Sequence, residues 1–568
     1  MNARKILCLM AAVLMLSGCS KGVDGSQASS KAAESSGKAD SSVSDYDNTT
    51  TEPETDKPEF DLNDSVIGFS QESGFYDSGF SLELTANEGE KIYYTTDGTD
   101  PRTSATREEY TAPIEIKDRS NDPNVVSAVP TEMISGNFNE FSFGEGDFWC
   151  NKKAPSDNAV DKCTVIRASS EKSDGSVSKS FSGSFYIGSA EEHIKGLKES
   201  CEAAGHDLAV MNITMDYADL FDSKIGIYVK GDIFNKALED YKASGESIEN
   251  ETARQLDANY KQRGKEWERD CHIELNEISA EGNVTNALSQ DCGIRIQGNY
   301  SRSDLQKGFR LYARKKYGEK KFKYEVFEGL KNASDETIDS FKTLTLRAGG
   351  NCAFTAKFND TYWQSLMKEF DGSTKASRPC VVYLNGEYWG LYVLEEDYSD
   401  NYFESHYGVN KDDVVVYKGD AETYQSGYKL DEGKLPEGET DEGYFFKELT
   451  DFFASHKDLS AQTDYEEFSK LVDTDSVRDY FLAEVWINNK WDWPGKNWSM
   501  WKVQNTDSSN EYAEGKWRFM FYDVEFGGVS GEGDAWTNTM KEDNYKPKGL
   551  LDTDTKNPAV LSFAVRVK

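Results

Sequence analysis

Basic residues are scarce in this sequence. Lys and Arg together number 64 against 101 Asp and Glu, which gives a formal net charge of −37 over 568 residues. So acidic a chain is not expected to have a nucleic-acid partner. The excess of acid favours a basic or cationic partner, or it simply keeps the protein soluble.

Histidine and metal-binding cysteine motifs are scarce too. The sequence has five His, nearly all outside the motifs described below, which argues against a His-based mechanism. None of the nine Cys stands in a CxxC spacing, so a metal cluster is not expected. Apart from Cys8 and Cys19 seven remain, an odd number that leaves at least one thiol free. Cys150 and Cys163 flank one polar loop, and we expect them to form a disulfide.

The apolar run at the N-terminus, residues 6–16, is too short to span a bilayer. It follows Arg4 and Lys5, as in a secretory signal peptide. It ends in Leu16-Ser17-Gly18-Cys19, which resembles a bacterial lipoprotein cleavage site. We therefore expect residues 1–19 to be a lipoprotein signal peptide with Cys19 as the lipidated residue. An ordinary signal peptide cut elsewhere is the alternative.

Residues 20–64 are rich in Ser, Asp, Glu and Thr and have few large apolar side chains. This composition is typical of a disordered tether. The expected location is that of an exported bacterial lipoprotein, held by its lipid anchor on the outer face of a membrane or at the cell surface.

Residues 65–188 are expected to form a first domain of short strands. Apolar runs at 80–85, 91–96 and 112–116 alternate with turns. The turn at 93–101, Tyr-Tyr-Thr-Thr-Asp-Gly-Thr-Asp-Pro, resembles the chitobiase/β-hexosaminidase C-terminal domain, an immunoglobulin-like β-sandwich. No confident pair of glycosidase carboxylates is present, so the expected role is a spacer, or a cell-wall or carbohydrate contact.

The segment 475–527 carries the chemistry. After an Asp475-Ser476 start signal, apolar residues recur at helical spacing up to Val485. The Pro- and Gly-containing stretch 491–497 must be an irregular loop. The apolar runs 498–503 and 517–522 then predict a hairpin that ends at Asp523.

This order of elements matches the lower half of a protein-kinase active site. Kinases place a catalytic Asp and, five positions later, an Asn in one loop, and return through a hairpin to a metal-binding Asp. Asp492 and Asn497 have that spacing, and Asp523 closes the hairpin. A carboxylate near the attacking hydroxyl and an oxygen-rich cage for Mg²⁺ suit phosphoryl transfer. The alternative is a surface loop with a helix-capping Asp and an Asp turn.

Residues 205–568 resemble the CotH kinase family, atypical kinases named after a spore-coat protein. The resemblance lies in four segments in the family's order. These are 293–312 (Gly-Ile-Arg-Ile-Gln-Gly at its start), 344–360 (Leu-Thr-Leu-Arg to Asn-Asp), 382–392 (Val-Tyr-Leu-Asn-Gly-Glu-Tyr-Trp-Gly-Leu-Tyr), and the Asp492/Asp523 region.

The resemblance assigns nucleotide-binding roles to Lys307 and Arg295, and to Glu395 or Glu396 at a hinge-like edge. Lys307 lies in a strip, 302–323, with nine Lys or Arg against two acids, which suits phosphate binding. Solvated strand faces also produce such runs.

Three further features bear on what the resemblance implies. Asp360 either supports the metal or starts a helix, and the helical reading is preferred. The chain has no His-Arg-Asp and no full glycine loop, and Asp523 is followed by Val-Glu-Phe-Gly. Only 41 residues follow Gly527, and the apolar run that begins at Leu561 has no helix stop signal. We expect the C-terminal lobe to be minimal or cut short.

The sequence thus predicts an α+β fold, an atypical kinase-like two-lobed domain preceded by an immunoglobulin-like sandwich. The expected activity is transfer of the ATP γ-phosphate to Ser or Thr hydroxyls of proteins, with ATP and Mg²⁺ or Mn²⁺ as cofactors. Asp492 would be catalytic, and Asn497 and Asp523 would bind the metal. A silent surface scaffold or adhesin, and transfer of another nucleotide-derived group such as AMP, are the alternatives.

Overall fold

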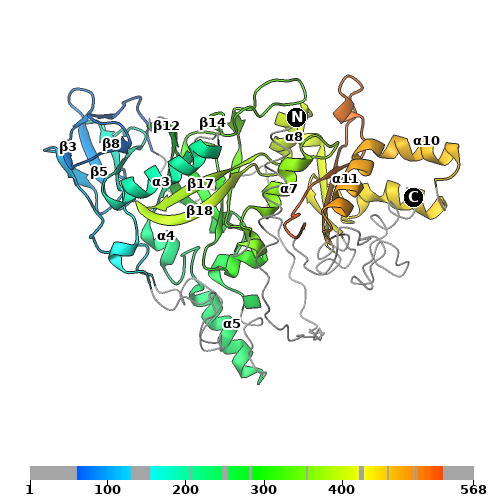
Figure 1. The fold of residues 1–568 in the computed structure, drawn as a ribbon, viewed down its shortest axis with the longest axis horizontal. Helices are drawn as coiled ribbons and strands as arrows, with labels where there is room; N and C mark the ends of the chain where they lie inside the picture. Colours follow the sequence, from blue (N-terminus) through cyan, green and yellow to red (C-terminus); the bar gives the residue numbers. More distant parts are fainter. Residues whose placement is uncertain are drawn as a thin grey trace. The chain divides into compact units, whose positions relative to one another are not determined.

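The structure is a computed structural model. It describes residues 60–129, 154–204, 208–245, 254–279, 284–353, 356–420, 428–456, 459–489, 493 and 496–528. All of them belong to one unit, Ser44–Lys568. Helices and strands are mixed along the chain (Figure 1), so the fold is α+β as predicted.

The N-terminal part of the described chain consists of short strands in three small sheets. The sheets are ordered β2-β9-β8-β5-β6, β1-β4 and β3-β7. The strands are β1 (Gly68–Phe69), β2 (Gly74–Phe75), β3 (Phe80–Leu82), β4 (Leu84–Thr85), β5 (Lys91–Thr95), β6 (Glu108–Glu109), β7 (Ile114–Ile116), β8 (Thr164–Glu171) and β9 (Phe181–Tyr186). Leu82, Ile92 and Ile166 lie in their shared core. The three predicted apolar runs coincide with β3 and β4, β5 and β7.

Seven strands form a closed barrel in the order β10-β11-β12-β13-β16-β18-β17. They are β10 (Leu208–Thr214), β11 (Arg269–Ile278), β12 (Val284–Gln297), β13 (Gly308–Tyr312), β16 (Thr343–Arg347), β17 (Ser377–Leu384) and β18 (Glu387–Glu395). Side chains alternate between the two faces of each strand. Ile294, Ile296, Leu344 and Leu346 therefore fill the barrel core.

In the sequence, Asn385-Gly386 between two apolar runs predicts a type I′ hairpin, and the tight turn between β17 and β18 confirms it. Asn385 and Gly386 both have positive φ, 49° and 77°, as a type I′ turn requires. The two long strands lie side by side in Figure 1.

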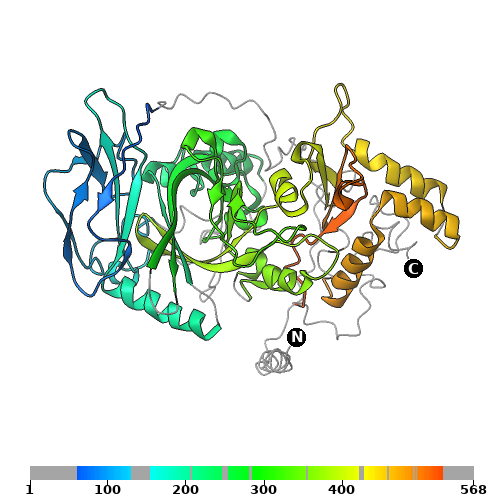
Figure 2. The same ribbon diagram turned by 90° about the horizontal axis from the view of Figure 1, so that it is seen from above.

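The remaining helices and short strands between residues 189 and 407 are not part of the barrel sheet. They are α3 (Ser189–Ala204), α4 (Tyr217–Phe221), α5 (Gly231–Ala243), α7 (Asn359–Met367), α8 (Asp400–Tyr407), β14 (Phe322–Lys323) and β15 (Ser340–Phe341). Ala190 and Ile194 of α3 pack against Leu208 and Val210 of β10, together with Tyr186 of β9. Helix α3 thus covers the junction of the N-terminal strands with the barrel (Figure 2).

A second sheet, ordered β20-β19-β21-β22, follows the barrel. Its strands are β19 (Val414–Asp420), β20 (Tyr428–Glu432), β21 (Lys496–Val503) and β22 (Arg518–Met520), and its helices are α9 (Lys447–Ser455), α10 (Gln462–Leu471) and α11 (Thr474–Trp486). The predicted helix and hairpin are confirmed by α11 and by the β21–β22 pair. The helix starts slightly earlier than predicted, because Asp473 is its N-cap and accepts from the amides of Asp475 and Ser476.

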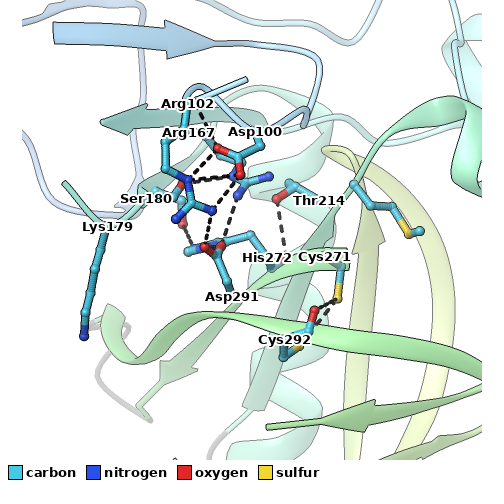
Figure 3. A network of polar contacts seen from close by, with 12 residues as sticks. Asp100, Arg102, Arg167, Lys179, Ser180, Thr214, Cys271, His272, Asp291 and Cys292 are labelled. Carbon is cyan, nitrogen blue, oxygen red and sulfur yellow. Dashed lines mark hydrogen bonds and ion pairs between the residues drawn. The ribbon is translucent and has the colours of Figure 1, made fainter. Parts of the chain in front are cut away.

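The Asp291 network joins the N-terminal strands to the barrel (Figure 3), and we define it as Asp291, Arg102, Arg167 and His272. Asp291 Oδ2 accepts from Arg102 at 2.6 Å, and its Oδ1 accepts from Arg167 at 3.1 Å. His272 Nδ1 also donates to Oδ1, at 2.8 Å. Arg102 and Arg167 belong to the N-terminal part, and His272 and Asp291 to β11 and β12, so these contacts bridge the two.

Cys163 is a free, buried thiol among the described residues. Its Sγ donates to Asn212 Oδ1 at 3.4 Å, at the junction with β10. The predicted Cys150–Cys163 disulfide stays a prediction, because Cys150 lies outside the described residues.

Candidate functional site

The turn that follows β22 is held by the first residues of α7. The backbone amide of Val524 donates to Asp360 Oδ1 at 2.8 Å. Asn359 Nδ2 and Trp363 Nε1 both donate to the carbonyl of Gly527, at 3.0 and 2.7 Å. Three side chains of one short helix thus fix the position of the turn that begins at Asp523.

Arg347, the last residue of β16, pairs with three carboxylates. Its Nη2 lies 3.0 Å from Asp523 Oδ1 and 2.8 Å from Glu525 Oε2, and its Nη1 lies 3.5 Å from Asp360 Oδ2. We call these four residues the Arg347 network. Burial alone would lower the pKa of Arg347, but the three carboxylates raise it well above its ordinary value. Arg347 is therefore a permanent cation at the centre of the network.

The acids of this network differ in their electrostatics. Burial opposes ionisation of Asp360, yet the charges of Arg347 and Lys375 lower its pKa below the ordinary value. Burial and the charge of Asp523 raise the pKa of Glu525 to about 7, although Arg347 opposes this. Asp360 is thus ionised at neutral pH, whereas Glu525 is close to half-protonated.

A Gly-Gly turn encloses the Glu525 carboxylate. Asn351 donates to Glu525 Oε1 from its backbone amide at 3.2 Å and from Nδ2 at 2.8 Å. Gly350 has a positive φ of 56°, and a Cβ at this position would collide with Glu525 Oε2. A residue with a side chain is excluded here both by its φ and by the carboxylate.

Asp523 combines partial exposure with an uncommon backbone. Its side chain is 31% exposed, against 2% for Asp360 and 4% for Glu525. Asp523 and Asn497 have φ of 55° and 56°, in the left-handed region. Such conformations are rare for residues other than Gly and are enriched at functional sites. Because β21 and β22 are antiparallel, Asn497 at the start of β21 and Asp523 just after β22 lie at the same end of the pair.

A polar row crosses four neighbouring strands of the barrel, and its member on β16, Thr345, lies two residues before Arg347. Arg295 pairs in register with Arg310, Arg310 with Thr345, and Thr345 with Glu395. The adjacent residues Ile294, Phe309, Leu344 and Leu394 face the barrel core, so the row lies on the outer face. Two predicted nucleotide-binding residues, Arg295 and Glu395, stand at the two ends of this row.

The members of this row are buried and highly polar. Arg295 Nε donates to Glu268 at 3.1 Å, Arg310 pairs with Asp397 at 3.0 Å, and Glu395 Oε1 accepts from Lys375 at 2.7 Å. Within the described part of the chain, Thr345 Oγ1 and Glu395 Oε2 are buried without a hydrogen-bond partner. Buried polar atoms are usually paired with protein, water or ligand. These two neighbouring atoms therefore mark a place where a polar ligand group could bind.

The other predicted site residues lie elsewhere. The Lys307 ammonium donates to the carbonyls of Arg302 and Asp304 at 2.8 and 2.7 Å and lies 4.0 Å from the ring centre of Tyr260. Burial lowers its pKa well below the ordinary value. Glu396 accepts from the amide of Ala376 at 2.9 Å and contacts His406 Nε2 at 2.8 Å. Asp492 and Cys19 lie outside the described residues.

Sequence reasoning did not single out Arg347, Glu525, Arg310 or Thr345 as site residues. The alternation of polar Thr343, Thr345 and Arg347 with Leu344 and Leu346 was the available signal, since it marks a strand with one polar face. Glu525 had no such signal, because it acquires its partners from residues more than 170 positions away.

Searched over the described residues, the structure contains no group of three or more His, Cys, Asp or Glu that could hold a metal ion. None of the described helices has the length and apolar composition needed to cross a bilayer.

Comparisons with known proteins give two family matches. The family model described as CotH kinase protein matches residues 294–559. The family model described as Fn3 associated matches residues 82–185, which contain most of the N-terminal strands. No curated protein matches the chain.

Proposed function

We propose that the protein transfers the γ-phosphate of ATP to Ser or Thr hydroxyls of proteins, because residues 294–559 match the CotH kinase protein family model and follow a β-rich module. The observation that carries the proposal is the Arg347 network. It holds Asp523 partly exposed, in a left-handed backbone, at the end of the hairpin that has Asn497 as the second residue of its first strand. A kinase-type metal Asp occupies the equivalent place in the order of elements.

We propose that the described elements form the two lobes of an atypical kinase. The barrel would be the first lobe, and the sheet β20-β19-β21-β22 with α9, α10 and α11 would be the second. Arg347 and the α7 contacts tie the Asp523 turn to the barrel, as a catalytic site between two lobes requires. The N-terminal strands would form an immunoglobulin-like sandwich that acts as a spacer, or as a contact to cell wall or carbohydrate.

The donor set fits Mg²⁺ at Asp523 and Asn497, because carboxylate and amide oxygens are its usual protein ligands. When bound, Mg²⁺ or Mn²⁺ would neutralise the charge of the nucleotide phosphates. Asp523 has a second carboxylate oxygen besides the one that faces Arg347, and the side chain is partly exposed. Arg347 would hold Asp523 in position through the 3.0 Å ion pair.

The polar row is the proposed nucleotide-binding site. Arg295 and Arg310 supply positive charge, and Thr345 Oγ1 and Glu395 Oε2 supply buried polar atoms that a ligand could satisfy. Lys307 keeps its predicted phosphate role only if its ammonium leaves the carbonyls of Arg302 and Asp304. Asp492 is the proposed base that accepts the hydroxyl proton.

The proposed setting is that of an exported lipoprotein anchored through Cys19. The proposed partners are protein substrates with Ser or Thr, with a basic sequence favoured by the charge of −37. Nucleic acid is not a proposed partner.

The test is transfer of label from ATP to protein, with Mg²⁺ or Mn²⁺, on a Ser-rich basic peptide and on the protein itself. Label in the γ position should enter protein, and label in the α position should not. Entry of α label would favour transfer of AMP. Asp523→Ala should remove Mg·ATP-dependent thermal stabilisation, and equal stabilisation of variant and parent would reject Asp523 as a metal ligand.

A catalytically silent scaffold is the second candidate. The observation that favours it is the Arg347 guanidinium, which already neutralises Asp523 and Glu525. A scaffold would show no transfer of either label, with or without metal.

A further inference from the structure

Two buried cysteines face each other inside the barrel. Cys271 of β11 and Cys292 of β12 are direct partners in the antiparallel register. Their sulfur atoms are 3.5 Å apart (Figure 3). The exposed fractions are 3% for Cys271 and 0% for Cys292.

The backbone geometry of this pair is compatible with a disulfide. Directly opposed residues of antiparallel strands have Cα atoms about 4.5–5.5 Å apart, and disulfides join Cα atoms about 4.4–6.8 Å apart. Closing the bond therefore needs a small approach of the sulfur atoms and no change of register.

The other described cysteines have different surroundings. The thiol of Cys163 donates to the Asn212 side chain, and those of Cys352 and Cys380 donate to the carbonyls of Glu525 and Val381. Cys271 and Cys292, in contrast, each have the sulfur of the other as a partner.

We propose that Cys271 and Cys292 form a cross-strand disulfide in the mature protein. The oxidant is the disulfide of a small thiol or of an oxidoreductase. One cysteine thiolate attacks it, forms a mixed disulfide and releases one thiol. The second cysteine thiolate then attacks the mixed disulfide, closes the Cys271–Cys292 bond and releases the second thiol. Two protons from the cysteines end on the two released thiols, so the oxidant is reduced by two electrons.

Burial sets the time at which this bond can form. An oxidant cannot reach the sulfurs in the closed barrel, and burial also raises the pKa of Cys292 well above its ordinary value, which disfavours the thiolate. The bond therefore forms while the β11–β12 hairpin is still open, and the barrel then protects it. The export expected from residues 1–19 would place folding in an oxidising compartment.

The position of the bond gives it a structural effect. The next pair along the same strands is His272 and Asp291, which belong to the Asp291 network. The cysteines point into the barrel, and His272 and Asp291 point toward the N-terminal strands (Figure 3). The disulfide would thus fasten, from inside, the strand pair that carries this junction.

The test is to refold the full chain with a mixture of oxidised and reduced glutathione, block free thiols and digest with a Glu-specific protease. Glu274, Glu277 and Glu281 separate the two cysteines, so only a disulfide keeps their peptides linked. We expect the linked peptides from most of the refolded parent, and from the matched control Cys380→Ser. Blocked thiols at both Cys271 and Cys292 in refolded parent would overturn the proposal.

If a variant folds poorly or the peptides are not recovered, thermal unfolding gives a second test of the disulfide. Reductant present during refolding should lower the melting temperature of the parent by several degrees, because the crosslink constrains the unfolded chain. The double variant Cys271→Ser/Cys292→Ser should melt at the same temperature with and without reductant. A parent that is insensitive to reductant would also overturn the proposal.

Discussion

The Asp291 network and the Arg347 network use the same residue types for different ends. In the first, one carboxylate receives two arginines and a histidine, and the Asp291 side chain is 12% exposed. In the second, one arginine serves three carboxylates, and the Asp523 side chain is 31% exposed. The Asp291 carboxylate is thus enclosed by its partners. In the Arg347 network Asp360 and Glu525 are buried, and only Asp523 is partly exposed, which suits a carboxylate that receives a metal ion.

The largest expected effect is on the rate of phosphate transfer at the proposed catalytic site. Asp492→Asn keeps the size of the side chain but removes the carboxylate that receives the hydroxyl proton. The rate of transfer at saturating Mg·ATP should fall by about 10²–10⁴, roughly 3–5 kcal/mol of barrier. ATP affinity should change little, since Asp523, Asn497 and the polar row hold the nucleotide in the proposal.

The comparison of parent and Asp492→Asn separates three outcomes. A slow variant with unchanged ATP affinity supports the proposed base. Equal rates would show that Asp492 is not the base. Nucleotide binding without transfer by either protein would make the scaffold the better description.

The second effect is on stability, at the centre of the Arg347 network. Arg347→Met fills the space but leaves buried carboxylates without their cation. Breaking a buried ion pair from one side costs about 3–5 kcal/mol, which urea unfolding would measure. The matched control is Arg478→Met, because Arg478 also pairs with three carboxylates but its side chain is 53% exposed. The control should have little effect, and equal losses would contradict the buried role of Arg347.

The third effect is on stability, at the Asp291 network. Asp291→Asn keeps the shape of the side chain and weakens its hydrogen bonds to charged partners, so stability should fall by about 1.5–3 kcal/mol. The positive charges of Arg102 and Arg167 and the bond from His272 lower the Asp291 pKa despite burial. Its stabilisation is therefore full above the ordinary Asp pKa of about 3.9 and is lost as the pH falls below it.

Parent and Asp291→Asn should thus differ at neutral pH and converge in acid. Glu319→Gln is the control, because the exposed Lys179–Glu319 pair also bridges the N-terminal strands and the barrel region. If Glu319→Gln loses as much stability as Asp291→Asn, burial is not the reason why the Asp291 network stabilises the protein.

Local patterns in the sequence were enough to predict several elements of this fold. The Asn385-Gly386 turn, helix α11 and the β21–β22 hairpin depend on short-range spacing and turn chemistry, which are visible along the chain. The position of Asp523 at the end of the hairpin followed from the same spacing. The closed barrel was not predicted, because its closure pairs β10 with β17 across more than 160 residues.

The candidate site was predicted only where its residues have local signals. Arg295 and Glu395 came from the family resemblance, but their alignment with Arg310 and Thr345 depends on the register of four strands. Lys307 shows the opposite problem. Its basic neighbours suggested a phosphate contact, whereas its burial against carbonyls and Tyr260 depends on tertiary packing.

The smallest expected effect comes from the raised pKa of Glu525 in the Arg347 network. Burial and the charge of Asp523 raise the pKa of Glu525 to about 7, from an ordinary value of about 4.3. Between these values the folded protein binds more protons than the unfolded chain, so stability falls as the pH rises through this range. We expect the free energy of unfolding to fall by an amount on the order of 2 kcal/mol, which denaturant unfolding between pH 4.5 and 7.5 would measure.

Glu525→Gln removes the titration and should flatten this slope while keeping a partner for Asn351. Glu514→Gln changes a surface acid near β22 and should keep the parent's slope. The direction separates the two networks, since Asp291 stabilises more as the pH rises whereas Glu525 stabilises less. If Glu525→Gln keeps the slope of the parent, another acid titrates in this pH range. Glu525 would then not be the acid of the Arg347 network that destabilises the fold when it ionises.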